Sequence, residues 1–366
     1  MSHIIAAKRS AVVPRNGAFA QLLPHQIAAP VIQDALQEAS LTPDQVGELI
    51  LSNALGAGGN QARIAALAAG LPERVGGLSI DRQCAGGLDA LILADAMIRS
   101  GLHDVVIAGG VESYSRRPLR MHQFSDGRDP EPYDQALFTP WPDRDPDMAT
   151  AADTLAQKLG ITQDAQDLWA LDSHAKAMSQ RADLQHELTV VSDTINDTFT
   201  RNLTPRHCEK AKTVAGSITA ANMAVAADGA AFVVMVSDRI AKQLARPSLR
   251  FSAGVSLGAD PEQPGLAPVP AINALCQQTG HGPQSFDHIE IMEAFAVQAI
   301  ACVQGARLDP SKVNQKGGAL ARGHPIGASG AILAVRLFHD LSASGQTGLA
   351  AIAAAGGLGS AAIFET

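Results

Sequence analysis

Cys84 and His324 are the two residues whose types and spacing most directly suggest chemistry. They lie 240 residues apart, and an internal repeat has the same offset. A repeat at a fixed offset indicates two related, fused halves. A thiol and an imidazole at equivalent points of the halves predict one active site on the axis between them, with the imidazole as base for the thiol. The repeated positions are Pro30, Ile32, Pro43, Leu49 and Leu51, which recur as Pro270, Ile272, Pro283, Ile289 and Ile291.

The surroundings of both residues support a chemical role. Cys84 is followed by small residues and an apolar helical stretch at 87–99, so it is expected at a helix N-terminus, where backbone N–H groups stabilise a thiolate. His324 stands in the glycine-dense segment 317–330, ahead of a second apolar helix. Packing explains a histidine poorly where so few side chains are near. The alternatives are a buried small cysteine and a histidine that only caps the turn.

Alternating strands and helices must position these residues. Apolar, β-branched stretches predict strands, and 3.6-residue periodicity predicts helices between them, which is the pattern of a βαβ organisation. A helix as apolar as 87–99 cannot face water, so we expect it between two sheets. Stacking the two halves then gives a five-layer α/β/α/β/α arrangement. The expected strands are 3–13, 48–53, 104–110, 228–236, 248–256, 288–292 and 348–355, and the expected helices are 30–39, 87–99, 149–185, 327–341 and one from 270.

Composition divides the chain further. Residues 117–147 are rich in proline and charge and have little periodicity, which is typical of an elaborated loop. We therefore expect an inserted loop domain that interrupts the first half. The predicted boundaries are 1–116 and 219–258 for the N-terminal half, 117–218 for the insertion and 259–366 for the C-terminal half.

Bulk properties exclude several functions. The 366 residues are 46% hydrophobic and 17% charged, as in a compact buried protein, and the net charge of −8 argues against nucleic-acid or membrane-surface binding. No uncharged stretch has the length of a membrane span. The four cysteines lack C-x-x-C spacing, so we expect no metal site, and free thiols indicate a reducing compartment, the cytoplasm.

Seven segments together resemble the thiolase family and span nearly the whole chain. The histidine segment is the most specific of them, whereas the glycine turns alone would be weak evidence. The segments are GNQARIAALAAGLP (59–72), DRQCAGGLDAL (81–91), AGGVES (108–113), ADGAA (227–231), MEAFA (292–296), GGALARGHPIGASG (317–330) and AAGGLGSAAIFE (354–365).

The resemblance implies a thiolase-like five-layer fold and acyl transfer between coenzyme A thioesters. It implies that Cys84 becomes acylated, that His324 activates it, and that the backbone N–H groups of Cys84 and Ala355 form the oxyanion hole. Met148 and Phe295 match positions that line the acyl and pantetheine pocket, although ordinary core packing would explain them as well. Met292 and Ala353 belong to the same expected pocket, and Glu293 and Gly357 support the site.

Two positions depart from the family pattern. The family has a second catalytic cysteine where this chain has Ala353, and an asparagine that holds a water where it has Met292. A methyl group and a thioether replace neither an acid/base nor a water anchor. Where the family has a histidine directly before the position of Met148, this chain has Asp147. The parts for acylating Cys84 are therefore present, but those for carbon–carbon bond chemistry are incomplete.

This pattern leads to three hypotheses. The first is an acetyl-CoA C-acyltransferase type of enzyme that works through an acyl-cysteine. The second keeps the acyl-cysteine but discharges it to water or to a non-CoA acceptor, with Glu293 as a possible recruited base. The third is a non-catalytic, acyl-CoA-binding subunit. The resemblance further implies no bound cofactor, acyl-CoA as substrate, and a homodimer or homotetramer.

Overall fold

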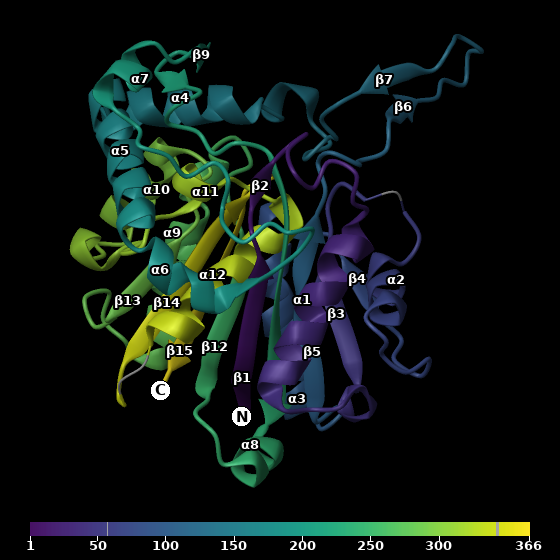
Figure 1. Ribbon diagram of the computed structural model, residues 1–366. Helices are drawn as coiled ribbons and strands as arrows, with labels where there is room; N and C mark the ends of the chain where they lie inside the picture. The colour runs from purple at the N-terminus through teal and green to yellow at the C-terminus, as the bar shows by residue number, and fades with distance from the viewer. Residues whose placement is uncertain (57, 342–343) are drawn as a thin grey trace.

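The computed structural model describes residues 1–56, 58–341 and 344–366 (Figure 1). Its main sheet is continuous, in the order β13-β14-β15-β12-β1-β11-β5-β3-β4. The strands of the N-terminal half are β1 (Ser2–Ser10), β3 (Glu48–Ser52), β4 (Leu78–Ile80), β5 (Val105–Glu112) and β11 (Ala227–Ser237). Those of the C-terminal half are β12 (Leu249–Gly258), β13 (His288–Ile291), β14 (Thr347–Ala354) and β15 (Leu358–Glu365). The short strand β2 (Val13–Pro14) pairs with β11, and the short strand β8 (Leu188–Thr189) pairs with β1.

The two half-sheets join through a short antiparallel pairing. In it, Ser2, His3 and Ile4 of β1 face Phe251, Arg250 and Leu249 of β12. The helices of the N-terminal half are α1 (Pro24–Ala39), α2 (Gln61–Ala68), α3 (Gly86–Arg99) and α8 (Asp238–Leu244). Those of the C-terminal half are α9 (Pro268–Thr279), α10 (Ala296–Gly305), α11 (Ala319–Arg322) and α12 (Ile326–Asp340).

The sequence repeat is a structural repeat. β3 and β13 begin 240 residues apart, and so do α3 and α12. α3 and α12 pack against each other and against strands of both half-sheets, while α1 and α2 cover one outer face and α9 the other. Three separate apolar cores fill the spaces between these layers. The predicted five-layer arrangement is therefore confirmed.

Glycines let the two central helices approach closely at their N-terminal ends. A Cβ atom on Gly87 would lie 2.6 Å from the backbone nitrogen of Ala331, and one on Gly330 would lie 2.4 Å from that of Leu88. Contacts this short are excluded for any side chain. The first turns of α3 and α12 therefore meet backbone to backbone, which brings the residues just before them together.

The insertion is less regular than the two halves, as expected, but it contains more structure than a loop. A hairpin projects from the body of the protein at the upper right of Figure 1, within a segment for which we expected no strands. The predicted helical stretch 149–185 divides into separate helices, because Gly160 adopts a left-handed conformation. The elements are β6 (Arg120–His122), β7 (Glu131–Tyr133), α4 (Met148–Leu159), α5 (Gln163–Ser179), α6 (Arg181–Leu184), α7 (Pro205–Glu209), β9 (Thr213–Ala215) and β10 (Ile218–Thr219).

Buried ion pairs fasten the insertion to the central layers. Arg9 of β1 lies 2.7 Å from Asp197 and donates from Nε to Glu187 at 2.6 Å. Arg336 of α12 contacts the other oxygen of Glu187. Burial alone would raise the pKa of Glu187, but Arg336 and Arg9 lower it to about 2. Such a network holds only when all its members are present, because one unpaired buried charge is costly. It fixes the position of the insertion over the core.

Candidate active site

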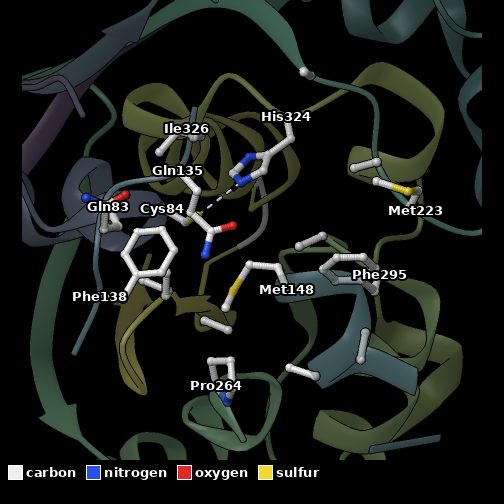
Figure 2. A pocket seen from close by; sticks show the side chains of 18 of the residues that line it. Gln83, Cys84, Gln135, Phe138, Met148, Met223, Pro264, Phe295, His324 and Ile326 are labelled. Carbon is white, nitrogen blue, oxygen red and sulfur yellow. Dashed lines mark hydrogen bonds between the residues drawn. The ribbon is translucent and has the colours of Figure 1, made fainter. Parts of the chain in front are cut away.

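The thiol and the imidazole singled out by the repeat are in contact. His324 Nε2 lies 3.1 Å from Cys84 Sγ, as the dashed line in Figure 2 shows. Both side chains are partly exposed. Cys84 belongs to a short turn directly before α3, and His324 comes two residues before α12. The close approach of the two helices therefore brings together residues that are 240 positions apart in the chain.

The tautomer of His324 is set by Ser329. Nδ1 of His324 lies 2.7 Å from Ser329 Oγ, and that hydroxyl donates to the Pro325 carbonyl at 3.0 Å. A hydroxyl has only one proton to donate, so towards the ring it accepts. Nδ1 then carries the ring proton, and Nε2 presents a lone pair to the Cys84 thiol. This is the arrangement that a general base needs.

The backbone around each residue is held in a defined conformation. Gln83, which precedes Cys84, has φ of 49°, an uncommon left-handed value for a residue with a side chain. Its backbone N–H donates to Asp81 at 2.9 Å. The backbone N–H of His324 donates to the Val225 carbonyl at 2.8 Å. These contacts aim the two side chains at each other from opposite walls.

Burial favours the neutral form of both groups. It raises the pKa of the Cys84 thiol to about 12, although the backbone N–H groups of Cys84 and Ala355 act in the opposite direction. Burial and, secondarily, Arg322 lower the pKa of His324 to about 4. Burial therefore opposes the stabilised thiolate that we expected at this helix N-terminus. The helix N-terminus does favour the anion, but loss of water outweighs it.

The proposed oxyanion-hole donors lie beside the sulfur. The backbone N–H groups of Cys84 and Ala355 both act to lower the pKa of the Cys84 thiol, against the larger effect of burial. Ala355 directly follows β14, and Gly356 and Gly357 then have φ of 79° and 75°. A Cβ atom on Gly357 would also lie 2.7 Å from the Ala259 carbonyl oxygen. Glycine is needed for this turn, which orients the Ala355 N–H.

A cavity of about 360 Å³ opens beside the pair. Met148, Phe295 and Ala353 line it together with Cys84 and His324, as we expected from the sequence. Figure 2 shows the side chains of Met148 and Phe295 directed into the same space. Most of its wall is apolar, which suits an acyl chain better than a charged group.

Two further residues of the expected site lie behind this wall. Met292 is 1% exposed, packs in the central core and is not among the described residues that line the cavity. Glu293 is equally buried and accepts four hydrogen bonds, from Trp169, Ser173, Asn314 and the Leu320 backbone. A carboxylate engaged this fully is a structural hub, and it does not reach the cavity as a base.

Glu112 is a supporting residue that the sequence pattern did not identify. It is fully buried at the end of β5 and accepts from the N–H groups of Ala54, Leu55 and Gly327. Burial raises its pKa to about 7. Because Gly327 belongs to the first turn of α12, Glu112 fixes the helix start that comes after His324. In the sequence it stood out only as part of the segment AGGVES (108–113), to which no role was assigned.

Among the described residues, no group of three or more His, Cys, Asp or Glu side chains could hold a metal ion. The cysteines Cys84, Cys208, Cys276 and Cys302 are free thiols. The described helices include none that is both long and apolar enough to span a membrane. The groups that the site offers for chemistry are a thiol, an imidazole and backbone amides.

The neutral resting pair predicts an unusual pH dependence of Cys84 alkylation. Because burial favours the uncharged thiol, the thiolate fraction should keep growing as pH rises towards about 12. The iodoacetamide rate at Cys84, followed by peptide mass spectrometry, should therefore still increase above about pH 9. Cys84→Ser identifies the peptide signal. A rate that levels off below about pH 7.5 would contradict this, since it would indicate a thiolate–imidazolium pair.

Comparisons with known proteins agree with the fold. The model of the thiolase N-terminal domain matches residues 2–239, and that of the thiolase C-terminal domain matches residues 245–366. A crystal structure of the Bacillus anthracis acetyl-CoA acetyltransferase superposes with a TM-score of 0.92 at 32% identity, covering 100% of this chain and 98% of that one. The Acat5 thiolase of Ascaris suum, solved in complex with coenzyme A, gives a TM-score of 0.93 at 28% identity and coverages of 100% and 99%.

Curated relatives match along their whole length. "Putative acetyl-CoA C-acetyltransferase YhfS" of Bacillus subtilis strain 168 is 39% identical over 373 residues, covering 99% of this chain and 98% of the relative. VraB of Staphylococcus aureus strain MRSA252, which has the same description, is 35% identical over 374 residues with the same coverages. The chain belongs to the thiolase family and is an acyltransferase that moves acyl groups between coenzyme A thioesters.

Proposed function

We propose that Cys84 carries the acyl group and that His324 moves the proton in each direction. The observation that supports this most directly is the 3.1 Å contact between His324 Nε2 and Cys84 Sγ at the wall of the cavity. Ser329 keeps the proton on the far nitrogen of the ring, so the near nitrogen is free to accept. No metal or bound cofactor is needed for this transfer.

The first half-reaction forms the acyl-cysteine. His324 accepts the thiol proton as Cys84 Sγ attacks the thioester carbonyl of the acyl-CoA. The oxyanion that develops receives hydrogen bonds from the N–H groups of Cys84 and Ala355. The intermediate collapses, the bond between the carbonyl carbon and the CoA sulfur breaks, and His324 returns the proton to that sulfur. Free CoA leaves, and Cys84 holds the acyl group.

The second half-reaction passes the acyl group to an acceptor. With a CoA thiol as acceptor, the same steps run in reverse and give a new thioester. A neutral His324 is able to accept the acceptor's proton, because its pKa is lowered to about 4. One base therefore serves both halves, as in ping-pong catalysis.

Carbon–carbon bond chemistry places a further demand on the site. In the family it uses a second cysteine, at the position of Ala353 here. Ala353 lines the cavity beside Cys84, so its methyl group stands where an acid/base would act. Apart from Cys84, His324 and the arginines, the described titratable residues that line the cavity are Tyr114 and Asp134. We therefore expect acylation to be much faster than the carbon–carbon step.

The chain is proposed to act as a homo-oligomer, at least a dimer. β4 is the last strand in the sheet order, so one of its backbone edges has no strand partner among the described residues. Leu78 of β4 and Leu93 of α3 are 36% and 38% exposed. An open edge flanked by apolar side chains is a common site for a second copy to pair.

The free thiols are in keeping with a reducing cytoplasm, which subcellular fractionation would test.

The proposed function predicts a covalent adduct at one residue. After brief incubation with acetyl-CoA or a longer acyl-CoA and acid quenching, intact-protein mass should rise by one acyl group. Cys84→Ala should abolish the adduct, because the nucleophile is lost. Cys276→Ala is the matched control and should retain it, since Cys276 lies in α9 and lines no part of the cavity. Unmodified wild-type protein across a wide acyl-CoA panel would refute the proposal.

Restoring a thiol at position 353 should improve the carbon–carbon step. Ala353→Cys places an acid/base on the cavity wall, and such a group contributes about 10²–10⁴-fold to a rate. We expect acetoacetyl-CoA thiolysis to rise at least about tenfold. Ala353→Ser is the control, because its hydroxyl has similar size but is a far weaker acid. Equal rates for wild type and both variants would show that the missing thiol is not what limits this step.

If two copies pair through the open edge of β4, the protein should have the mass of an oligomer, and a change at that edge should lower the mass. Light scattering at micromolar concentration should give at least twice the 38.0 kDa of one chain. Replacing Leu78 by lysine should lower the measured mass, because an edge charge opposes strand pairing. A wild-type monomer would contradict the prediction.

A further inference from the structure

A second cavity of about 240 Å³ adjoins the first one. The two share part of their lining, namely Leu55, Tyr114, Arg117, Arg120 and Asp134. The second cavity is therefore a side arm of the catalytic cleft. Its wall differs in kind, because polar surface predominates there while apolar surface predominates around Cys84.

Three guanidinium groups give the side arm its charge. Arg15, Arg117 and Arg120 line it, and Asp134 is the one carboxylate among its described lining residues. Such an excess of positive charge is notable in a protein whose net charge is −8. Arginine recognises carboxylate and phosphate groups through paired N–H donors. The arm is thus suited to an anionic group.

Little of this charge is used within the chain. Arg117 lies 2.9 Å from Asp134, but the Asp134 side chain is 89% exposed, and such a surface pair is weak. Arg120 donates one N–H to the Ala54 carbonyl at 2.9 Å, which holds its guanidinium at the wall and leaves its other donors available. Arg15 has only a minor electrostatic interaction with Asp228: burial raises the pKa of that carboxyl, and Arg15 acts weakly in the opposite direction.

Tyr114 connects the arm to the nucleophile. It lines both cavities, and the Arg117 guanidinium lies 5.8 Å from the centre of its ring. Its phenol is close enough to Cys84 on one side, and to Arg117 and Arg15 on the other, for each of them to affect its pKa. An acyl chain that starts at Cys84 and runs past Tyr114 would therefore end among the arginines.

We propose that this arm binds the terminal carboxylate of the acyl chain, so that the enzyme prefers dicarboxylic acyl-CoA substrates over uncharged ones. The inference rests on the proposed acylation of Cys84. A phosphate of coenzyme A has the same recognition chemistry. However, the long pantetheine arm separates the phosphates from the thioester, whereas the side arm shares Leu55 and Tyr114 with the cavity that Cys84 lines. A carboxylate a few carbons from the thioester fits this position better.

The test compares acyl groups that are matched in length. Cys84 acylation rates would be measured for succinyl-, glutaryl- and adipyl-CoA against butyryl-, valeryl- and hexanoyl-CoA. The same acyl groups would be supplied as pantetheine thioesters, which lack the nucleotide phosphates. At one chain length or more we expect the carboxylated member to react at least about tenfold faster, on both carriers, because a hydrogen bond to a charged group gives about 10- to 150-fold.

Variants separate the arginines from general effects on the fold. Arg117→Gln and Arg15→Gln should each lower the carboxylate preference about tenfold or more, with the uncharged thioester as the internal reference. Arg15→Lys should restore part of it, since the charge remains. Arg116→Gln is the matched control, because Arg116 is exposed, contacts Gln21 and lines neither cavity.

Three outcomes would overturn the inference. The first is equal reactivity of carboxylated and uncharged partners at every chain length. The second is a loss in the arginine variants that affects all CoA thioesters alike and spares the pantetheine thioesters, which would assign the arm to a coenzyme A phosphate. The third is the absence of acylation with any thioester, whether its acyl group is carboxylated or uncharged. That outcome would refute the proposed function itself.

Discussion

The backbone contact between the first turns of α3 and α12 is the constraint on which the site depends. Gly87 and Gly330 leave no room for a Cβ atom there, and the helices meet at the axis that relates the two halves. The residues directly before α3 and those directly before α12 therefore lie close to each other. Cys84 and His324 occupy these places, so the duplication of a single βαβ scheme supplies both members of the pair. Each half contributes one group, and neither half has a complete site.

Burial influences the protonation state of Cys84 and His324 before a substrate binds. Although both side chains are partly exposed, loss of hydration around them favours the uncharged form of each. In the proposed mechanism, charge appears only when a thioester is bound and the proton moves, at the moment when the N–H groups of Cys84 and Ala355 would receive the new oxyanion. The same donors lower the energy of the thiolate and of the oxyanion. A thiol that stays neutral until then is also protected from oxidation and stray alkylation.

The sequence predicted what periodicity and repetition encode, and missed what depends on distant side chains. The 240-residue offset predicted the Cys84–His324 contact, and apolar runs located most strands within a few residues. The protonation state was missed, because a helix N-terminus is visible in sequence whereas the degree of burial is not. The role of Ser329 was missed as well, since only the folded turn shows that its hydroxyl donates elsewhere. Two arginines of the arm, Arg117 and Arg120, lie in the segment 117–147, where prolines, charges and the lack of periodicity indicated only an elaborated loop.

The two ends of the cleft differ in what they restrain. Around Met148 and Phe295 the wall is apolar and constrains shape, while around Arg117 and Arg120 it constrains charge. The cavity that Cys84 lines reaches both ends, so both select the substrate at once. Ala353 affects the later chemistry, because a methyl group leaves the α-carbon of the bound acyl group without a nearby thiol. In the proposed mechanism Cys84, His324 and the backbone donors carry out acyl transfer from the duplicated core, and the insertion supplies two of the arginines proposed to select the substrate.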